Sequence, residues 1–207
     1  MIKKIIIFGT GGLLKEHFFW IKDSIKEKNE YKIEAIVSNK EESKDFFDIP
    51  IINEKELVYD DSYYLHISIG SIKIRSDIIK KFYNYNFFTL VHPSAIISGG
   101  AKIGKGCTIS PNTIIAGDAI IGDFNFFNFN SMISHDCITG KNNVFSPGCK
   151  IMGWCNIGSN NYFGADSIMI PKKKIGNLNI IGANSTLIDD FKDNNLIVGS
   201  PAKVKIK

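Results

Sequence analysis

The sequence contains no run of about 18 apolar residues, the length that a transmembrane helix requires. Its first apolar run, Ile5–Phe8, follows Lys3 and Lys4, is only four residues long and ends at a glycine. A run this short is typical of a buried strand, because the apolar core of a signal peptide is about twice as long. We therefore expect a cytoplasmic protein without a membrane partner.

Strong charge and metal-binding motifs are also absent. The 25 Lys and Arg residues only slightly outnumber the 21 Asp and Glu residues, which gives a net charge of +4, and the lysines are scattered. This weak excess does not indicate a nucleic-acid partner. The four cysteines form no Cys-x2-Cys pair, the spacing that a zinc site usually needs, so we expect no metal.

What the sequence does contain is an apolar residue at almost every sixth position from Ile97 to Leu187. The steps are all six residues, except for a step of five from Ile133 to Ile138 and a compensating step of seven from Val144 to Ile151. This period fits neither an α-helix, at 3.6 residues, nor a strand, at 2. It predicts a parallel β-helix of about five coils, with three six-residue units per coil. The predicted inward residues are Ile97, Ile103, Ile109, Ile115, Ile121, Phe127, Ile133, Ile138, Val144, Ile151, Ile157, Phe163, Met169, Ile175, Ile181 and Leu187.

Small residues follow this period. Glycines often come directly after an inward residue, as in Ile121-Gly122 and Ile157-Gly158, where a Cβ would crowd a tight corner. Three cysteines, Cys107, Cys137 and Cys155, lie four residues after an inward residue, in a slot that elsewhere holds Ser, Thr or Ala. We therefore interpret the cysteines as small packing residues.

Residues 1–90 show a different pattern, in which strands alternate with helices. Strands are expected at 5–8, 33–37 and 63–69, with helices at 15–28 and 75–83, which together indicate a parallel sheet of βαβ units. Gly9-Thr10-Gly11-Gly12 lies where Rossmann-like domains hold a phosphate, although the full G-x-G-x-x-G spacing is absent. Nucleotide binding and a purely structural turn both remain open, and the domain boundary is expected near Pro93.

The candidate for chemistry is His135, in the sequence Ile133-Ser134-His135-Asp136-Cys137. This segment contains the shortened step, and irregular coils redirect side chains, as bulges do near active sites. A carboxylate beside an imidazole orients it and raises its basicity, as a general base needs near neutral pH. The residues alone leave a structural role open. His17 and His66, on an expected helix and a buried strand, are interpreted as structural.

The whole chain resembles one family, the hexapeptide-repeat sugar O- and N-acetyltransferases of the sialic acid O-acetyltransferase and bacillosamine-type N-acetyltransferase kind. The resemblance rests on short segments spread over residues 2–205. These are Ile6–Gly12, Ile67–Gly70 with Arg75, Val91–Ala95, Ile133–Cys137, Ser146–Gly148 and Gly199–Lys203.

The resemblance implies an α/β Rossmann-like domain over residues 1–90 that binds a sugar or nucleotide-sugar acceptor. It implies a left-handed parallel β-helix acyltransferase domain with a short C-terminal tail over 91–207, assembled as a homotrimer with acetyl-CoA between neighbouring copies. By the resemblance, His135 is the general base, Asp136 raises its basicity and no covalent acyl-enzyme forms. Asn143, Gly153, Ala165 and Ala183 match positions on the acetyl-CoA side, with the Gly153 N–H available to an oxyanion. Gly11, Gly12, Leu13, Ser38, Asn39 and Gly70 match the acceptor pocket.

Three departures from the family pattern concern the substrates. Leu13 stands where a histidine is usual, Ser38 and Asn39 replace a pair that is often acidic, and Asn143 replaces a histidine but can still donate a hydrogen bond. The resemblance implies N-acetylation of a nucleotide-linked amino sugar, with O-acetylation of a sialic or other nonulosonic acid as the alternative. The neutral pair Ser38-Asn39 favours the UDP-linked amino sugar less than an acidic pair would. A zinc lyase on the same prism would need three histidines, and only His135 lies within the coils. A catalytically silent scaffold is the remaining alternative from another class.

Overall fold

The computed structural model describes residues 2–39 and 45–205 of the chain, and residue 1, residues 40–44 and the last two residues of the expected tail lie outside them. The chain divides into two compact units, Met1–Leu90 and Val91–Lys207.

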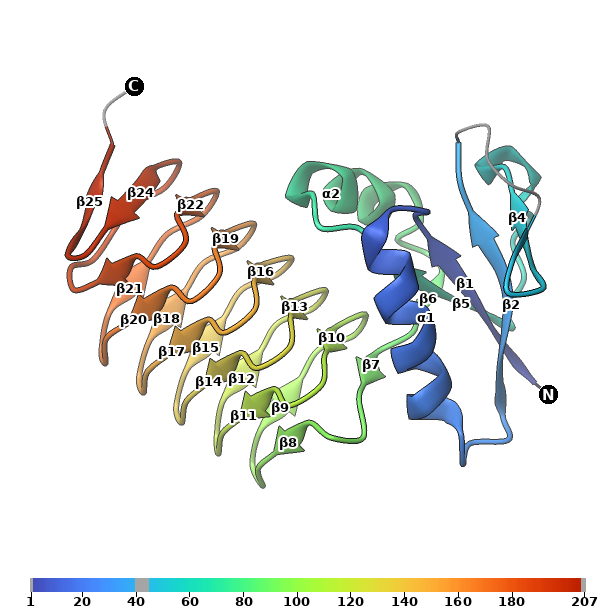
Figure 1. The fold of residues 1–207 in the computed structure, drawn as a ribbon, viewed down its shortest axis with the longest axis horizontal. Helices are drawn as coiled ribbons and strands as arrows, with labels where there is room; N and C mark the ends of the chain where they lie inside the picture. Colours follow the sequence, from blue (N-terminus) through green and yellow to red (C-terminus); the bar gives the residue numbers. More distant parts are fainter. Residues whose placement is uncertain (1, 40–44, 206–207) are drawn as a thin grey trace. The chain divides into compact units, whose positions relative to one another are not determined.

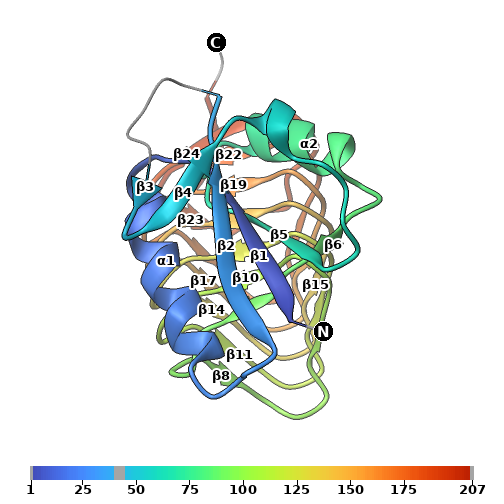
Figure 2. The ribbon, with the colours of Figure 1, turned by 90° about the vertical axis from the view of Figure 1, so that its right-hand side faces the viewer.

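The first unit is an α/β sheet (Figure 1). Its elements are β1 (Lys3–Phe8), α1 (Gly12–Ile25), β2 (Tyr31–Val37), β3 (Asp45–Phe46), β4 (Ile49–Ile52), the 3₁₀ helix η1 (Glu54–Glu56), β5 (Tyr63–Ile67), α2 (Ile72–Lys81) and β6 (Asn86–Phe87). The strand order is β3-β4-β2-β1-β5-β6, and every neighbouring pair is parallel except the β3–β4 hairpin. Figure 2 shows β2, β1 and β5 side by side in this order. The expected parallel sheet is thus present, with an added hairpin that the sequence did not predict.

Both faces of this sheet are covered, and the side chains of β1 alternate between the two faces. Ile5 and Ile7 pack with Phe18 and Ile21 of α1 in one buried cluster. On the other face, the Phe8 ring lies 5.0 Å from the ring of Phe82, which caps α2. Because β1, β2 and β5 are parallel, the Gly-rich turn after β1 lies beside the ends of β2 and β5, at the carboxyl edge of the sheet. Folds of this kind bind their ligands at that edge.

The second unit is a parallel β-helix whose strands, mostly two residues long, form three sheets (Figure 1). The β7 sheet contains β7 (Leu90–Val91), β10 (Thr108–Ile109), β13 (Phe126–Phe127), β16 (Val144–Phe145), β19 (Tyr162–Phe163), β22 (Ile180–Ile181), β24 (Leu196–Gly199) and β25 (Ala202–Val204). The β8 sheet contains β8 (Ile96–Ile97), β11 (Ile114–Ile115), β14 (Met132–Ile133), β17 (Lys150–Ile151), β20 (Ile168–Met169) and β23 (Thr186–Leu187). The β9 sheet contains β9 (Lys102–Ile103), β12 (Ile120–Ile121), β15 (Ile138–Thr139), β18 (Asn156–Ile157) and β21 (Lys174–Ile175).

The six-residue period is confirmed for most of the predicted inward residues but is wrong between Ile133 and Ile151. Ile138 is 47% exposed, whereas Thr139 is 4% and Phe145 1% exposed. Thr139 pairs with inward Ile121, and Phe145 pairs with Phe127. The period therefore continues without a slip, through residues 133, 139, 145 and 151. Ile97, in the first coil, is 38% exposed.

The interior of the β-helix explains why a threonine is tolerated there. The Thr139 hydroxyl lies 3.2 Å from Nδ2 of Asn125, a buried side chain from the neighbouring coil, so its polar atom is paired. On the next inward column, Phe127, Phe145 and Phe163 stack with ring centroids 4.4 and 4.9 Å apart. A period of apolar residues alone could not identify a position that is satisfied by hydrogen bonding.

Candidate functional site

His135 lies in the turn between β14 and β15, at the corner that joins the β8 and β9 sheets. Its Nδ1 is 2.8 Å from Oδ2 of Asp136, and both side chains are nearly half exposed. If Nδ1 carries the proton, it donates to the carboxylate and leaves Nε2 as the acceptor. The two predicted catalytic residues are therefore brought together in a geometry suited to a general base.

The irregular coil expected around His135 does not exist, since the period is unbroken there. Asp136 instead belongs to a regular series: every sixth residue from Gly100 to Asn184 has a positive φ, with values from 53° to 82°. Asn, Asp and Gly tolerate this left-handed conformation best, and they hold most of the series. An aspartate at position 136 thus serves the turn as well as the imidazole.

Gly153 lies one coil beyond His135 at the same corner, directly against the imidazole. A Cβ on Gly153 would lie 2.7 Å from Cε1 and 2.8 Å from Nε2 of His135, closer than real contacts allow. The coil-to-coil ladder uses the N–H groups of Met152 and Trp154 on either side and not that of Gly153. Gly153 therefore lies directly against the imidazole, on the side of Nε2.

Trp154, which the sequence did not single out, completes the surroundings of His135. Its ring meets the imidazole edge to face at 4.4 Å between centroids, and the backbone N–H of Trp154 donates to the His135 carbonyl at 3.1 Å. The Lys172 ammonium lies 5.5 Å from the centre of the Trp154 ring. Trp154 holds a positive-φ position, which is unusual for so bulky a side chain.

Asn143 does not fit the role expected from the resemblance. It is completely buried, its Nδ2 donates to Asn125 Oδ1 and to the Gly158 carbonyl, both at 2.9 Å, and its Oδ1 accepts from Asn161. Equivalent bonds join Asn161 to Asn179, and the Asn179 side chain to the Asn195 N–H. Asn143 is therefore part of an asparagine ladder inside the β-helix, and none of its amide hydrogens is left for acetyl-CoA.

Ala165 and Ala183 lie at a different corner of the prism from His135. Ala165 follows β19 and Ala183 follows β22, both in the β7 sheet, whereas His135 and Gly153 follow strands of the β8 sheet. Ala165 is partly exposed and Ala183 exposed. One copy of the chain thus does not bring all of the predicted acetyl-CoA residues to a single site.

The six predicted acceptor residues do come together, in a cavity of ≈ 750 Å³ within the first unit. Gly11, Gly12 and Leu13 come from the start of α1, Ser38 and Asn39 from the end of β2, and Gly70 from the segment after β5. No heavy atom lies within 4 Å of a Cβ built on Gly11 or Gly12, so this end of the cavity is open to a ligand. At position 13, the apolar side chain of Leu13 lines the cavity where the family usually has a histidine.

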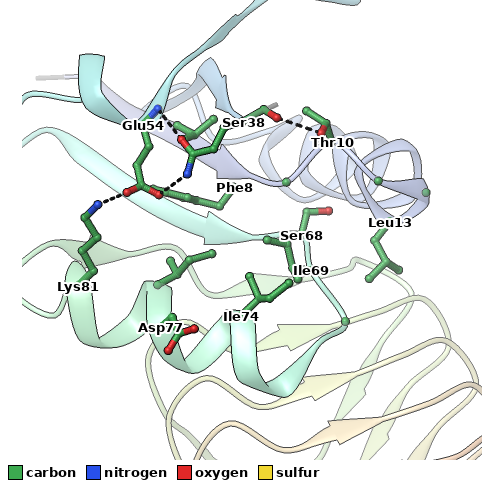
Figure 3. A pocket seen from close by; sticks show the side chains of 17 residues that line it. Phe8, Thr10, Leu13, Ser38, Glu54, Ser68, Ile69, Ile74, Asp77 and Lys81 are labelled. Carbon is green, nitrogen blue, oxygen red and sulfur yellow. Dashed lines mark hydrogen bonds and ion pairs between the residues drawn. The ribbon is translucent and has the colours of Figure 1, made fainter. Parts of the chain in front are cut away.

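The polar wall of this cavity includes residues that the sequence did not indicate. Glu54 receives a hydrogen bond from Asn39 Nδ2 at 3.2 Å and an ion pair from Lys81 (Figure 3). The Glu54 N–H donates to Asn39 Oδ1 at 3.3 Å, and the hydroxyls of Thr10 and Ser38 lie 3.3 Å apart. Because η1, α2 and the segment after β2 each supply one member of the Asn39–Glu54–Lys81 group, only the folded chain reveals it.

His17 and His66 lie in the interior of the first unit, which fits their interpretation as structural residues. His17 and His66 are buried and joined at 2.9 Å between Nδ1 and Nε2. Burial, reinforced by the Arg75 charge, lowers the pKa of His66 to about 3 and holds the pKa of His17 well below its usual range. Both rings therefore stay neutral near pH 7 and are not bases for catalysis.

All four cysteines are buried and none forms a disulfide. Cys149 joins the other three in the small-residue slot, because it follows inward Phe145 by four residues. Burial raises the pKa of Cys149 to about 12. A thiol–thiol hydrogen bond raises the pKa of Cys137 and lowers that of Cys155. Their packing inside the prism matches the interpretation as small core residues.

Within residues 2–39 and 45–205, no three His, Cys, Asp or Glu side chains gather closely enough to hold a metal ion. No helix in the same part of the chain combines the length and the apolar character needed to cross a membrane.

The first unit is similar to known protein domains. Residues 4–82 match the family model described as the PglD N-terminal domain. UDP-N-acetylbacillosamine N-acetyltransferase of Bacillus subtilis (strain 168) is 28% identical over 116 residues, which cover 52% of this chain and 51% of the relative. The match thus spans about half the length of that curated relative.

Solved structures match the whole chain. The perosamine N-acetyltransferase of Caulobacter crescentus, as a histidine-to-asparagine mutant with CoA and GDP-perosamine, is 25% identical with a TM-score of 0.85, covering 100% of this chain and 99% of the other. The acetyltransferase domain of PglB from Neisseria gonorrhoeae, in complex with acetyl coenzyme A, is 21% identical with a TM-score of 0.88, covering 99% and 100%. The predicted resemblance is thereby confirmed: residues 4–82 match the PglD N-terminal domain, and the chain shares the α/β domain and left-handed parallel β-helix of these sugar acetyltransferase structures.

Proposed function

We propose that this protein transfers the acetyl group of acetyl-CoA to the amino group of a nucleotide-linked amino sugar in surface glycan biosynthesis. The observation that carries the proposal is the His135–Asp136 pair, which lies exposed on a β-helix with Gly153 against the imidazole. The relatives support it, since perosamine N-acetyltransferase was solved with both CoA and GDP-perosamine. The 28% identical relative is named for N-acetylation of a UDP-linked sugar.

In this proposal, His135 is the general base. Asp136 holds the proton on Nδ1, and Nε2 accepts a proton from the acceptor nitrogen as that nitrogen bonds to the thioester carbon. The Gly153 N–H donates to the oxygen on which negative charge develops. When the carbon–sulfur bond breaks, His135 returns its proton to the leaving thiolate, so that the free thiol and the acetylated amine are the products. The buried cysteines take no part.

The first unit binds the nucleotide part of the acceptor. The N-terminus of α1 begins at Gly11 without a side-chain cap, and no acidic residue lies in its first turn. The first amide groups of a helix and its dipole favour an anion, and Rossmann-like folds place a pyrophosphate there. The open space beside Gly11 and Gly12 fits a phosphate in that position.

The proposed assembly is a homotrimer. Because His135 and Gly153 lie at one corner of the prism and Ala165 and Ala183 at another, an acetyl-CoA site that uses all four needs two copies of the chain. In a trimer with three-fold symmetry, each copy supplies the His135 corner to one neighbour and the Ala165 corner to the other. Light scattering of the purified protein, with and without acetyl-CoA, tests this part of the proposal.

The activity is tested by measuring free thiol release from acetyl-CoA against a panel of acceptors. The panel contains UDP-, dTDP- and GDP-linked 4-amino sugars, free sialic and legionaminic acids, and CMP-sialic acid. Turnover with a nucleotide-linked amino sugar, with an N-acetyl product by mass spectrometry, supports the proposal. Turnover with nonulosonic acids alone assigns O-acetylation instead. Acetyl-CoA binding without turnover on any acceptor counts against this substrate class, and loss of both binding and turnover leaves the scaffold alternative.

A further inference from the structure

The polar wall of the acceptor cavity contains an acid that the strand sequence alone does not supply. In Rossmann-like domains a carboxylate after the second strand bonds the ribose of the nucleotide. Here the residue at that place is Asn39, and both ends of its amide are engaged by Glu54, at 3.2 and 3.3 Å. Asn39 therefore acts as a clamp that brings a carboxylate from η1 to the end of β2.

Glu54 is well placed to receive a ligand. Its side chain is only 15% exposed and lies in the cavity wall, while its charge is balanced by Lys81. Asn39 donates to Oε2 and Lys81 to Oε1. Each carboxylate oxygen accepts more than one hydrogen bond, so both retain capacity for hydroxyl donors. Two fixed oxygens side by side match the spacing of a vicinal diol.

A second polar group faces the same cavity from β5's end. Ser68 is 2% exposed, and its hydroxyl makes no hydrogen bond to any residue that the structure describes. A buried hydroxyl without a partner costs free energy, which a bound polar ligand removes. In Figure 3, Glu54 and Lys81 lie on one side of the cavity, Leu13 on the other, and Ser68 between them.

We propose that Glu54 binds the ribose hydroxyls of the acceptor nucleotide and so replaces the acid missing at Ser38 and Asn39. The inference rests on the proposed nucleotide-sugar acceptor and adds a specificity-determining residue to it. The ribose is favoured over a metal ion, because Lys81 already neutralises the carboxylate. It is favoured over the base, because the place at the end of β2 is that of the ribose when the phosphates lie at the N-terminus of α1.

The test compares the affinity of UDP with that of 2′-deoxy-UDP and 3′-deoxy-UDP by calorimetry, and repeats the series with the guanine nucleotides. In the wild type, removing the hydroxyl that Glu54 holds weakens binding about 10- to 100-fold, the range that a hydrogen bond to a charged group supplies. In Glu54→Ala the ribo and deoxy nucleotides bind within about twofold of each other. Glu27→Ala removes an exposed acid outside the cavity and keeps the wild-type ratio.

Thermal melting of each variant shows whether it folds, and Glu54→Gln, which keeps one acceptor oxygen for Asn39, repeats the test if Glu54→Ala does not fold. An unchanged ribo-to-deoxy ratio in the folded variant overturns the inference and leaves the proposed acetyl transfer intact. Loss of the preference between uracil and guanine, with the ribose ratio kept, assigns Glu54 to the base and also overturns it. A wild type that binds no nucleotide, yet acetylates a free amino sugar, overturns both this inference and the nucleotide part of the acceptor. Nucleotide binding that shows the expected ratio without acetyl transfer supports Glu54 and counts against the proposed reaction.

Discussion

The two units of this protein form their candidate sites in opposite ways. In the β-helix, His135 occupies one position of a regular column, whose other members are Gly99, Gly117, Gly153 and Pro171. The small neighbours leave the imidazole exposed on an otherwise repetitive corner. In the α/β unit, the cavity is lined by the ends of β1, β2 and β5, by η1 and by α2, which are far apart in the sequence.

This difference suggests how each unit tolerates change. The β-helix repeats every 18 residues and is held by backbone hydrogen bonds between coils, which do not depend on the corner side chain. Replacing His135 should therefore leave the stability of the fold unchanged. The buried ladder residues of the same β-helix should show the reverse. The cavity of the first unit depends on contacts between segments, so its binding residues are also structural. The following predictions test this contrast.

The largest expected effect is the loss of the general base. His135→Ala should lower kcat by about 10²–10⁴, the span typical of general acid–base catalysis, with little change in melting temperature or oligomeric state. Steady-state thiol release and thermal melting measure both properties. Equal turnover of the mutant and the wild type would remove His135 from the mechanism.

Asn143→Ala should show the opposite behaviour. It removes the partner of Asn125, Gly158 and Asn161 inside the prism, so we expect a loss of about 2–4 kcal/mol in the free energy of unfolding. The KM for acetyl-CoA of the folded fraction should not change, because the side chain is completely buried. Denaturant unfolding measures the first effect, with the exposed Asn156→Ala as the control at about 0.5 kcal/mol or less. A raised KM with normal stability would restore Asn143 to the coenzyme site.

The sequence predicted the β-helix because one apolar residue per six suffices to mark it. It failed at Thr139 and Phe145, where the inward position holds a threonine paired to Asn125, while outward Ile138 imitates the expected residue. The same hidden hydrogen bonding misplaced Asn143. Apolar periodicity reports burial by hydrophobicity, and it does not see polar groups that are buried because they satisfy one another.

For the first unit, the sequence predicted the strands and the Gly-rich turn but not the polar wall. Glu54 and Lys81 are 27 residues apart, in elements of different type, and no spacing rule connects them. The six expected acceptor residues came from a resemblance, and all six line the cavity. Their charge-bearing neighbours depend on how η1 and α2 meet at the end of the sheet, which is a tertiary property.

An intermediate effect is expected where the β-helix holds the imidazole. Gly153→Ala places a methyl group against Cε1 and Nε2 of His135, so the ring must move, and we expect kcat to fall about 10- to 100-fold. Gly117→Ala is the matched control at the same corner, where the added Cβ would find only the Gly99 carbonyl, at 3.4 Å. If both variants kept full activity, the contact between Gly153 and His135 would not contribute to turnover.

The smallest effect concerns Trp154, a positioning residue that acts through His135. Trp154→Asn removes the edge-to-face contact, which is worth about 0.5–1.5 kcal/mol, so kcat should fall about 2- to 12-fold while the KM for acetyl-CoA is kept. Asparagine suits the positive φ of 58° better than tryptophan, so the same change should not destabilise the fold by more than about 1 kcal/mol.

Leu178→Asn is the matched control for this last prediction, since Leu178 is also bulky, exposed and held at a positive φ, of 60°, but lies at a corner that His135 does not share. It should raise stability by about 0.5–1 kcal/mol and leave kcat unchanged. Trp154→Asn should instead lower kcat even if it relieves backbone strain, because the strained position of Trp154 brings the aromatic ring against the imidazole. If both variants gained stability with no loss of turnover, Trp154 would have no role in positioning His135. The proposed reaction would then depend only on His135, Asp136 and Gly153.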